Sequence, residues 1–307
     1  MSGIKSSRPV GLLLALVLGG TAPLAALDQS CGPRDTPNQI LPGDPRWAAD
    51  LNVYPDQINS GTVAITGNNP RSGNGSLELT TSGSLFDWAF FQRLAEGGAW
   101  GLLSSVNCVT FDWFRAGYTL PPGAPASLTA ETWQEQTPVL RLMVRDVVDG
   151  QVLNSQLVWE RWYNTRDVLS PTPNDQWNFE DLTSQLFWRH FDGGNLYTNA
   201  GCANGGFNGS NNLQTFALGE WVSNCYSPTA EVYGIMIGLG SYWPGTYHAS
   251  LDNVQLAFNG QAGFAVEDNF ELGPTTVTPE PAAMLLLATG LAGMAGAALL
   301  RRKKSIA

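Results

Sequence analysis

The chain has 307 residues, a formal net charge of −10, and 11 tryptophans against two histidines. Six of its 16 basic residues lie near the two ends, so the body between them carries ten arginines against 26 acidic residues, a net charge of about −16. Such a field repels polyanions and excludes a nucleic-acid-binding body. The two histidines lie near no G-x-S-x-G motif, which argues against a serine hydrolase with a histidine base.

The first 26 residues are typical of a secretory signal peptide. Lys5 and Arg8 precede an apolar stretch from Val10 to Leu18, and small residues follow as far as Ala26. The Sec translocon reads this order of a basic, an apolar and a small-residue region. We expect cleavage after Ala26 and export of the body across the inner membrane.

Residues 27–272 are expected to form one domain, because no Pro/Ser-rich linker divides them and no internal repeat occurs. Short apolar or alternating segments are separated by Gly, Asn, Pro and Ser, which is typical of strands joined by turns. In 139–148, three apolar side chains alternate with Arg141 and Arg145, which predicts a sheet with one wet face. The predicted strands are 62–66, 76–80, 106–114, 139–148, 231–240 and 249–258.

Two further expectations concern the second half of the body. The last two predicted strands are separated by S-Y-W-P-G-T-Y-H, and we expect them to pair as a hairpin. Residues 179–191 instead place Leu182, Leu186 and Phe187 at helical spacing, with Asp181 as the N-cap, which predicts one short helix.

Three segments of the body carry a resemblance to a known fold. G-N-G-S-L-E-L (73–79), W-G-L-L-S-S-V-N-C-V-T-F-D-W-F (100–114) and A-S-L-D-N-V-Q-L (249–256) together resemble a galactose-binding-like jelly roll, in particular the laminin IV module and related carbohydrate-binding sandwiches. The resemblance spans about residues 46–258. The expected fold class is therefore all-β, a jelly-roll β-sandwich flanked by a signal peptide and a C-terminal transmembrane helix.

The same resemblance implies a structural calcium ion held by Asp252 and Glu78, since carboxylate oxygens suit this cation. In the alternative, Asp252 caps a turn with Asn253. Among the cysteines, we expect Cys202 to form a disulfide with Cys225, because the Gly/Asn-rich stretch 201–212 needs a covalent cross-link. Cys31 is then expected to form a disulfide with Cys108. Zinc is the rival interpretation, but no C-x-x-C pair occurs.

All the tryptophans lie in the body, and sugar rings stack on indoles while acidic or amide side chains bind the hydroxyls. Trp133, Tyr242 and Trp243 stand in loop-like surroundings and are the candidate saccharide-binding residues. A structural module without a sugar site and a polysaccharide-active enzyme are the alternatives. An enzyme would need paired carboxylates. The acidic cluster within 267–271 is instead expected to be a solvated strand, so we assign no catalytic residue.

Residues 273–281 form a linker that ends in Pro279, Glu280 and Pro281. The next 19 residues, 282–300, carry no charge, and a helix of this length reaches about 28 Å, enough to cross a bilayer. A basic tail, 301–307, begins with Arg301 and Arg302 and is expected to stay in the cytoplasm.

The Pro-Glu-Pro motif, the apolar segment and the basic end, in that order, resemble the PEP-CTERM sorting signal of Gram-negative bacteria that make exopolysaccharide. The resemblance implies that an exosortase cuts the inner-membrane-inserted precursor near the motif and passes the body to the cell surface or the exterior. An ordinary tail anchor is the alternative. The sequence thus predicts an exported, non-catalytic surface or matrix protein, with exosortase, the Sec translocon and exopolysaccharide as its partners.

Overall fold

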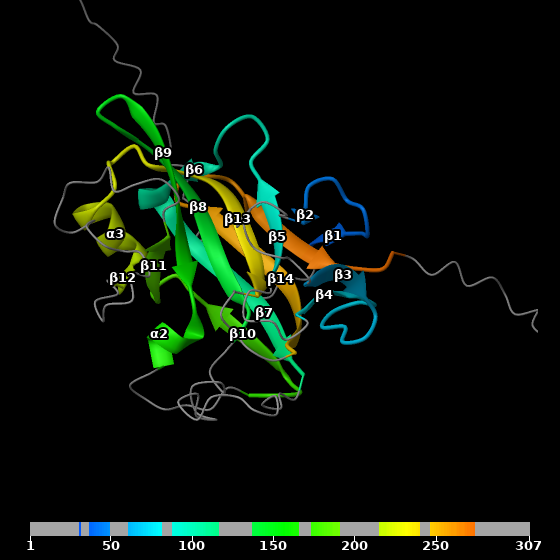
Figure 1. Cartoon of the computed structure of the whole chain (residues 1–307). Helices are drawn as coiled ribbons and strands as arrows, with labels where there is room; N and C mark the ends of the chain where they lie inside the picture. Colours follow the sequence, from blue (N-terminus) through cyan, green and yellow to red (C-terminus); the bar gives the residue numbers. More distant parts are fainter. Residues whose placement is uncertain are drawn as a thin grey trace, which may run out of the picture.

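The computed structural model describes residues 31, 37–49, 61–81, 88–116, 137–165, 173–190, 215–239 and 246–273. Within them the chain forms two β-sheets of seven and eight strands, packed as a sandwich (Figure 1). The predicted all-β sandwich is confirmed. None of the helices in this part of the chain is long and apolar enough to cross a membrane. The predicted signal peptide and the apolar segment 282–300 lie outside the described residues.

The first sheet, sheet A, is built around strand β14. One edge of β14 pairs with β7, and the other edge pairs with β4 and then with β15. Outside these lie β10 next to β7, β3 next to β4, and β1 parallel to β15. The strands of sheet A are β1 (Asn38–Ile40), β3 (Thr62–Thr66), β4 (Ser76–Thr80), β7 (Val106–Arg115), β10 (Trp177–Asp181), β14 (His248–Phe258) and β15 (Val266–Phe270).

The second sheet, sheet B, has the order β12-β11-β9-β8-β13-β5-β2, with β6 also paired to β13. Its strands are β2 (Ala48–Ala49), β5 (Ala89–Leu94), β6 (Gly101–Leu102), β8 (Val139–Val148), β9 (Gln151–Trp159), β11 (Leu186–His190), β12 (Thr215–Ala217) and β13 (Glu231–Leu239). The short helices are η1 (Leu103–Ser105), α2 (Arg161–Thr165) and α3 (Leu218–Asn224). Figure 1 shows α2 and α3 beside β11 and β12, on the opposite side of the molecule from β1–β4.

The main core lies between the two sheets and is filled by every second side chain of the long strands, because successive side chains of a strand point to opposite faces. For residues 139–148, the apolar face predicted from the alternation is the one that turns inward. The inward residues of β7, β8, β13 and β14 are buried, among them Val109, Phe111, Trp113, Leu140, Leu142, Val144, Ile235, Ile237, Leu239, Val254, Leu256 and Phe258.

The helix predicted for residues 179–191 is wrong. Its first residues end β10, its later residues form β11, and a turn joins them, in which the Gln185 N–H donates to the Leu182 carbonyl. Asp181 caps this turn by accepting the Thr183 N–H at 3.0 Å. Both strands find long partners, β7 and β9, and this pairing overrides a local preference worth only tenths of a kcal/mol per residue.

The predicted late hairpin is also wrong. Strand β13 lies in sheet B between β5 and β8, whereas β14 lies in sheet A between β7 and the β4/β15 pair. The chain therefore changes sheets between these strands. Each of them already has a partner on both edges, so neither has an edge left for the other.

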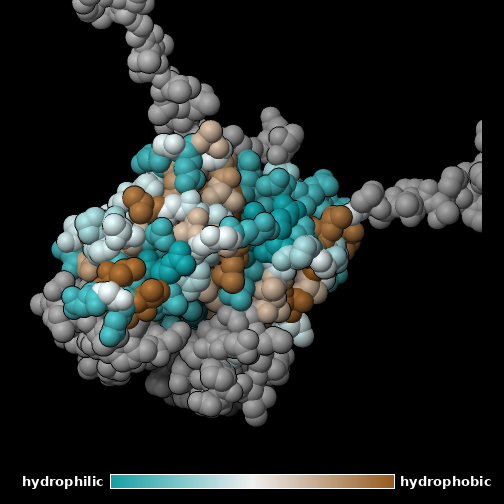
Figure 2. All heavy atoms as spheres, turned by 90° about the horizontal axis from the view of Figure 1, so that it is seen from above, coloured by the Kyte–Doolittle hydropathy of each residue, from teal (hydrophilic) through white to brown (hydrophobic). Residues whose placement is uncertain are grey.

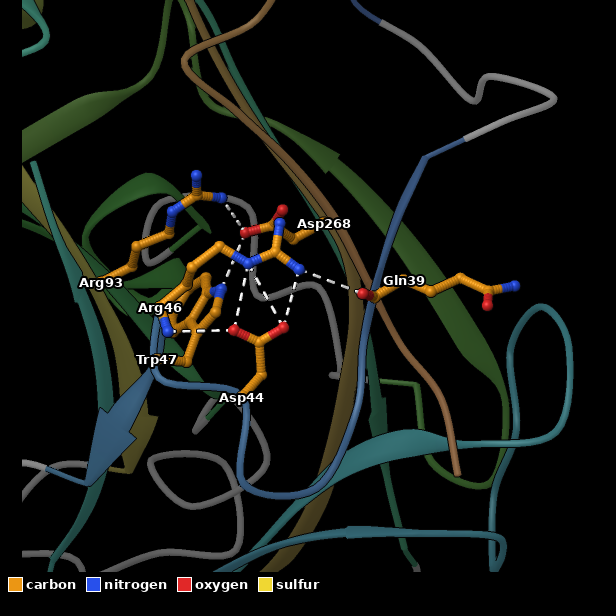
Figure 3. A network of polar contacts seen from close by, with 6 residues as sticks. All are labelled: Gln39, Asp44, Arg46, Trp47, Arg93 and Asp268. Atoms are coloured by element: carbon orange, nitrogen blue, oxygen red, sulfur yellow. Dashed lines mark hydrogen bonds and ion pairs between the residues drawn. The ribbon is translucent and has the colours of Figure 1, made fainter. Parts of the chain in front are cut away.

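The segment 37–49 closes one edge of the sandwich, since β1 joins sheet A and β2 joins sheet B. Inside this edge, Asp268 of β15 accepts the Trp47 indole N–H at 2.7 Å and forms an ion pair with Arg93 of β5 (Figure 3). The Trp47 ring stacks on Phe91 with centroids 5.3 Å apart. Residues from both sheets are thus tied together at a position closed to solvent.

The sequence predicted that the acidic cluster at residues 267–271 is a solvated strand. This prediction is wrong. Asp268 is 0% exposed and Glu271 is 4% exposed. One Glu271 oxygen accepts the N–H groups of Asn74, at 2.6 Å, and Gly75, at 3.0 Å. Gly73, at φ +74°, packs against the same carboxylate, and a Cβ atom there would overlap it. These acids hold the 67–75 loop and the sandwich edge in place.

The disulfide between Cys31 and Cys108 is present, as predicted, and ties residue 31 to strand β7 across a sequence separation of 77. Cys225, at the end of α3, is also disulfide-bonded. Its predicted partner, Cys202, lies outside the described residues, so that pairing stays a prediction.

Candidate functional site

A second cluster of buried side chains lies on the face of sheet B that points away from the main core. The predicted wet face of β8 is wrong here, because Val139, Arg141 and Met143 are all buried, with Arg141 only 3% exposed. We call this surface the outer face of sheet B. Its members are Trp88, Phe90, Gln92, Val139, Arg141, Met143, Gln156, Val158, Trp188, His190 and Met236.

Two glycines of the central strand β13 shape this face. A Cβ atom at Gly238 would overlap the Phe90 ring, and one at Gly234 would lie 2.7 Å from the Met143 sulfur. Glycine inside a strand marks a position where another group approaches the backbone closely. Because β13 has no side chain at these two positions, the side chains of β5 and β8 lie across it.

The polar groups of the face stand in register with its aromatic groups. Met236 of β13 lies opposite Arg141, Arg141 lies opposite Val158, and Val158 lies opposite Trp188. In the neighbouring row, Gln156 of β9 lies opposite His190. Arg141 therefore sits near the middle of the sheet, between the aromatic groups of β5 and those of β11.

Arg141 is held by Phe90 and Gln156. Its guanidinium carbon lies 4.3 Å from the Phe90 ring centroid, a cation–π geometry, and its Nη1 donates to Gln156 Oε1 at 2.7 Å. Its Nε is buried without a hydrogen-bond partner. No carboxylate of the described residues lies within ion-pair distance of this guanidinium.

Glu160 follows the end of β9 and is the carboxylic acid that Arg141 influences. Burial raises the pKa of the Glu160 carboxyl to about 7, and the positive charge of Arg141 and the Trp188 side chain oppose that shift. The carboxyl group is enclosed although the residue as a whole is half-buried. Near neutral pH this side chain is a mixture of acid and carboxylate, so it both donates and accepts hydrogen bonds.

The edge of this face beside β11 and α2 is the part that reaches solvent. Tyr163 of α2 and His190 of β11 are half-buried, and each packs edge-on against Trp188, with ring centroids 6.5 and 6.0 Å apart. Three rings thus follow one another along this edge, beside Gln156 and Glu160. Aromatic rings next to a few fixed polar groups are the usual lining of sites for small organic ligands.

Elsewhere, large hydrophobic side chains reach the surface in separate places. On the side of the molecule seen in Figure 2 they form small groups among hydrophilic residues rather than one continuous patch. Isolated apolar residues of this kind are normal on a soluble protein surface. Those of the described residues that are most exposed are Leu41, Leu94, Leu102, Val147, Val152, Phe179 and Leu272.

The two predicted calcium ligands lie on the outer face of sheet A. Asp252 is buried, and its oxygens accept the N–H groups of Asn253, Phe270 and Ser72. Burial raises the pKa of the Asp252 carboxyl to about 7, in spite of these hydrogen bonds. Although burial opposes ionisation, hydrogen bonds from Thr66 and Asn68 and the nearby His248 hold the pKa of Glu78 below its usual value.

These surroundings do not fit a calcium ion. Backbone N–H groups, the Ser72 hydroxyl and an amide N–H use the two carboxylates as acceptors, and calcium needs the same oxygens. No group of three or more His, Cys, Asp or Glu in the described part of the chain is arranged to hold a metal. The alternative, in which Asp252 caps a turn with Asn253, is present in the structure. Asn253 has a φ of 51°, and its N–H donates to Asp252.

The other residues singled out from the sequence lie outside the described residues: Trp133, Tyr242, Trp243, Pro279, Glu280, Pro281, Arg301 and Arg302. Trp188, Glu160 and Tyr163 were not expected from the sequence, and Arg141 was expected on an outward face without a role. The available signal was the pair of glycines on one strand face, Gly234 and Gly238 with Met236 between them, which marks a strand crossed by its neighbours' side chains.

No protein-family model matches the sequence, and no curated protein sequence matches it. The fold is similar to the family 11 carbohydrate-binding module from Clostridium thermocellum in complex with a beta-1,3-1,4-mixed-linked tetrasaccharide, with 11% identity over 68% of this chain and 87% of the module and a TM-score of 0.33. It is also similar to an exo-beta-agarase, with 12% identity over 67% of this chain and 24% of the agarase and a TM-score of 0.29. Similarities this distant do not transfer an activity to this chain.

Proposed function

We propose that the chain is an exported, non-catalytic protein that binds polysaccharide through the outer face of sheet B. The observation that carries the proposal is the row of Tyr163, Trp188 and His190 beside the polar side chains Gln156 and Glu160. Aromatic rings offer contact to the C–H faces of sugar rings, and the amide and carboxyl groups offer partners to the hydroxyls.

The arrangement of carboxylic acids on this face favours binding over hydrolysis. Glycoside hydrolysis uses two carboxyl groups about 5–10 Å apart. Among the described residues, Glu231 is a second acid on this side, and it pairs with Arg145 at 2.9 Å. Arg145 lies five positions along β8 from Leu140, which is the partner of Trp159, so about 17 Å of strand separates Glu231 from Glu160.

The proposed route to the exterior rests on the two ends of the sequence. We propose that the Sec translocon exports the body, that residues 282–300 hold the precursor in the inner membrane, and that an exosortase cuts near Pro279-Glu280-Pro281. Mass spectrometry of the mature C-terminus, on material from fractionated cells, tests this route. A C-terminus near residue 281 supports it, whereas an intact tail in the envelope fraction indicates a tail anchor.

The binding proposal is tested by affinity electrophoresis and tryptophan fluorescence against a panel of bacterial polysaccharides. We expect at least one polysaccharide to retard the chain and to quench its fluorescence. Y163A and W188F should weaken that binding several-fold. F179A is the matched control, since Phe179 is an aromatic side chain 46% exposed on sheet A, and its loss should leave binding unchanged.

Two outcomes contradict the proposal. If no polysaccharide binds, or if Y163A and W188F bind as well as the wild type, the outer face of sheet B is not a saccharide site. If reducing sugar is released during the assay and the release is lost in E160Q, the protein is an enzyme.

A further inference from the structure

Among the described residues, no acid lies within ion-pair distance of the Arg141 guanidinium, although its charge acts on the Glu160 carboxyl. Its contacts are a neutral amide, Gln156, and an aromatic ring, Phe90, and its Nε hydrogen is buried without a partner. A buried guanidinium without a paired anion is costly, because burial removes most of its hydration. Proteins place such a group where an anion binds, or they pair it with an acid.

Glu160 is not an adequate partner for this cation. No ion pair between the two residues is formed, and the pKa of about 7 leaves much of Glu160 uncharged at neutral pH. The other arginine on this face, Arg145, has its own acid, Glu231, at 2.9 Å. Of the two arginines of β8, Arg145 therefore has an ion-pair partner, whereas Arg141 has none among the described residues.

We propose that the ligand of the outer face of sheet B is an acidic saccharide, whose rings contact Tyr163 and His190 at the half-buried edge and whose carboxylate reaches the buried Arg141 guanidinium from that edge. This inference rests on the proposed saccharide-binding function and names its substrate class. A planar guanidinium with a free Nε–H matches the geometry of a carboxylate and can bind it through two parallel hydrogen bonds.

The negative charge of the body does not prevent this binding. The ten arginines and 26 acidic residues give a net charge of about −16, which repels acidic polymers at long range. At physiological ionic strength this field is screened over about 8 Å, whereas a contact at a buried cation is screened much less. We therefore expect selective binding at about 0.15 M salt and weaker association at very low salt.

The experiment compares two probes that differ only in charge. Polygalacturonate oligosaccharides and the same oligosaccharides with their carboxyl groups reduced to alcohols are titrated into the complete chain, purified in detergent, by isothermal calorimetry. We expect the acidic form to bind at least tenfold more tightly than the reduced form.

The variants R141Q, R141K and R145Q locate the effect. R141Q should abolish the preference for the acidic form, and R141K should retain part of it, because lysine keeps the charge but loses the planar fork. R145Q should bind like the wild type. A preference that survives in R141Q, or that disappears equally in R145Q, overturns the assignment to Arg141.

The wild-type comparison decides the inference even if R141Q fails to fold. Equal binding of the two forms overturns the acidic-ligand inference and leaves polysaccharide binding intact. Binding of neither form, together with a negative result for the whole polysaccharide panel, overturns the proposed function itself.

Discussion

Asp112 of β7 and Asp252 of β14 lie directly opposite each other in sheet A, and both are buried. Asp112 is neutralised by Arg71, whose Nε lies 3.1 Å from one carboxylate oxygen, and the Asn253 amide donates to the same oxygen at 2.7 Å. Asp252 receives hydrogen bonds but no ion pair among the described residues. One acid of the pair thus has a cationic partner, whereas burial favours the neutral form of the other.

Asp252 should make the fold less stable as the pH rises. Its pKa is raised from 3.8 to about 7, so between these values the folded state binds more protons than the unfolded state. Stability therefore falls with pH in this range, by roughly 4 kcal/mol for a shift of about three units. The contribution is fully present below about pH 4 and is lost as the pH passes 7.

Melting temperatures measured from pH 5 to pH 8 test this expectation. The wild type should lose stability across the range, and D252N should lose less, because an amide does not ionise. D149N, at an exposed turn, should follow the wild type. Parallel curves for D252N and the wild type would contradict the assignment.

The ion pair between Asp268 and Arg93 should matter far more than an exposed one. D268N leaves Arg93 without its partner at the closed edge of the sandwich, and breaking a buried pair in this way costs about 3–5 kcal/mol. E231Q breaks the partly exposed pair with Arg145 and should cost less than about 1 kcal/mol. Urea unfolding measures both, and equal costs would be incompatible with a bridging role for Asp268.

Gly238 should not tolerate a side chain. In G238A the new methyl group would overlap the Phe90 ring and the Ala89 carbonyl oxygen, so we expect a loss of at least about 1–3 kcal/mol. Gly219 in α3 is the matched control, because its Cβ position is open and alanine favours helix. Thermal unfolding should show G219A at or above the wild-type melting temperature; a wild-type-like G238A would refute the close packing of Phe90 on β13.

The disulfide between Cys31 and Cys108 should stabilise the fold by closing a long loop. With a sequence separation of 77, the entropy removed from the unfolded chain corresponds to about 4.5 kcal/mol. The double variant C31S/C108S, compared with the wild type by denaturant unfolding under oxidising conditions, should show a lower midpoint and a steeper slope, because the unfolded chain without this cross-link exposes more surface. An unchanged midpoint would mean that residue 31 contributes nothing to stability.

Calcium removal should leave the fold unchanged, since N–H and O–H donors already occupy the Asp252 and Glu78 oxygens. Melting curves with and without EDTA check this. If EDTA lowers the melting temperature by several degrees and added calcium reverses this change, the result would support the calcium ion implied by the jelly-roll resemblance.

The sequence by itself determined the all-β class, six strands and the faces that several of them turn toward the main core. Alternation of apolar side chains is a local consequence of strand geometry, so a pattern such as Val109, Phe111 and Trp113 could be read without knowing the partner strand. The pairing of Cys31 with Cys108 was also correct, because four cysteines allow few pairings.

Only the tertiary structure decided which strands pair and which polar residues are buried. Residues 186–190 form a strand because β9 and β12 offer ladder hydrogen bonds, and β13 and β14 separate because each finds partners in a different sheet. Arg141 and Asp268 look like surface residues in the sequence and are enclosed in the structure. Burial of a charge depends on groups distant in the sequence, which local pattern does not encode.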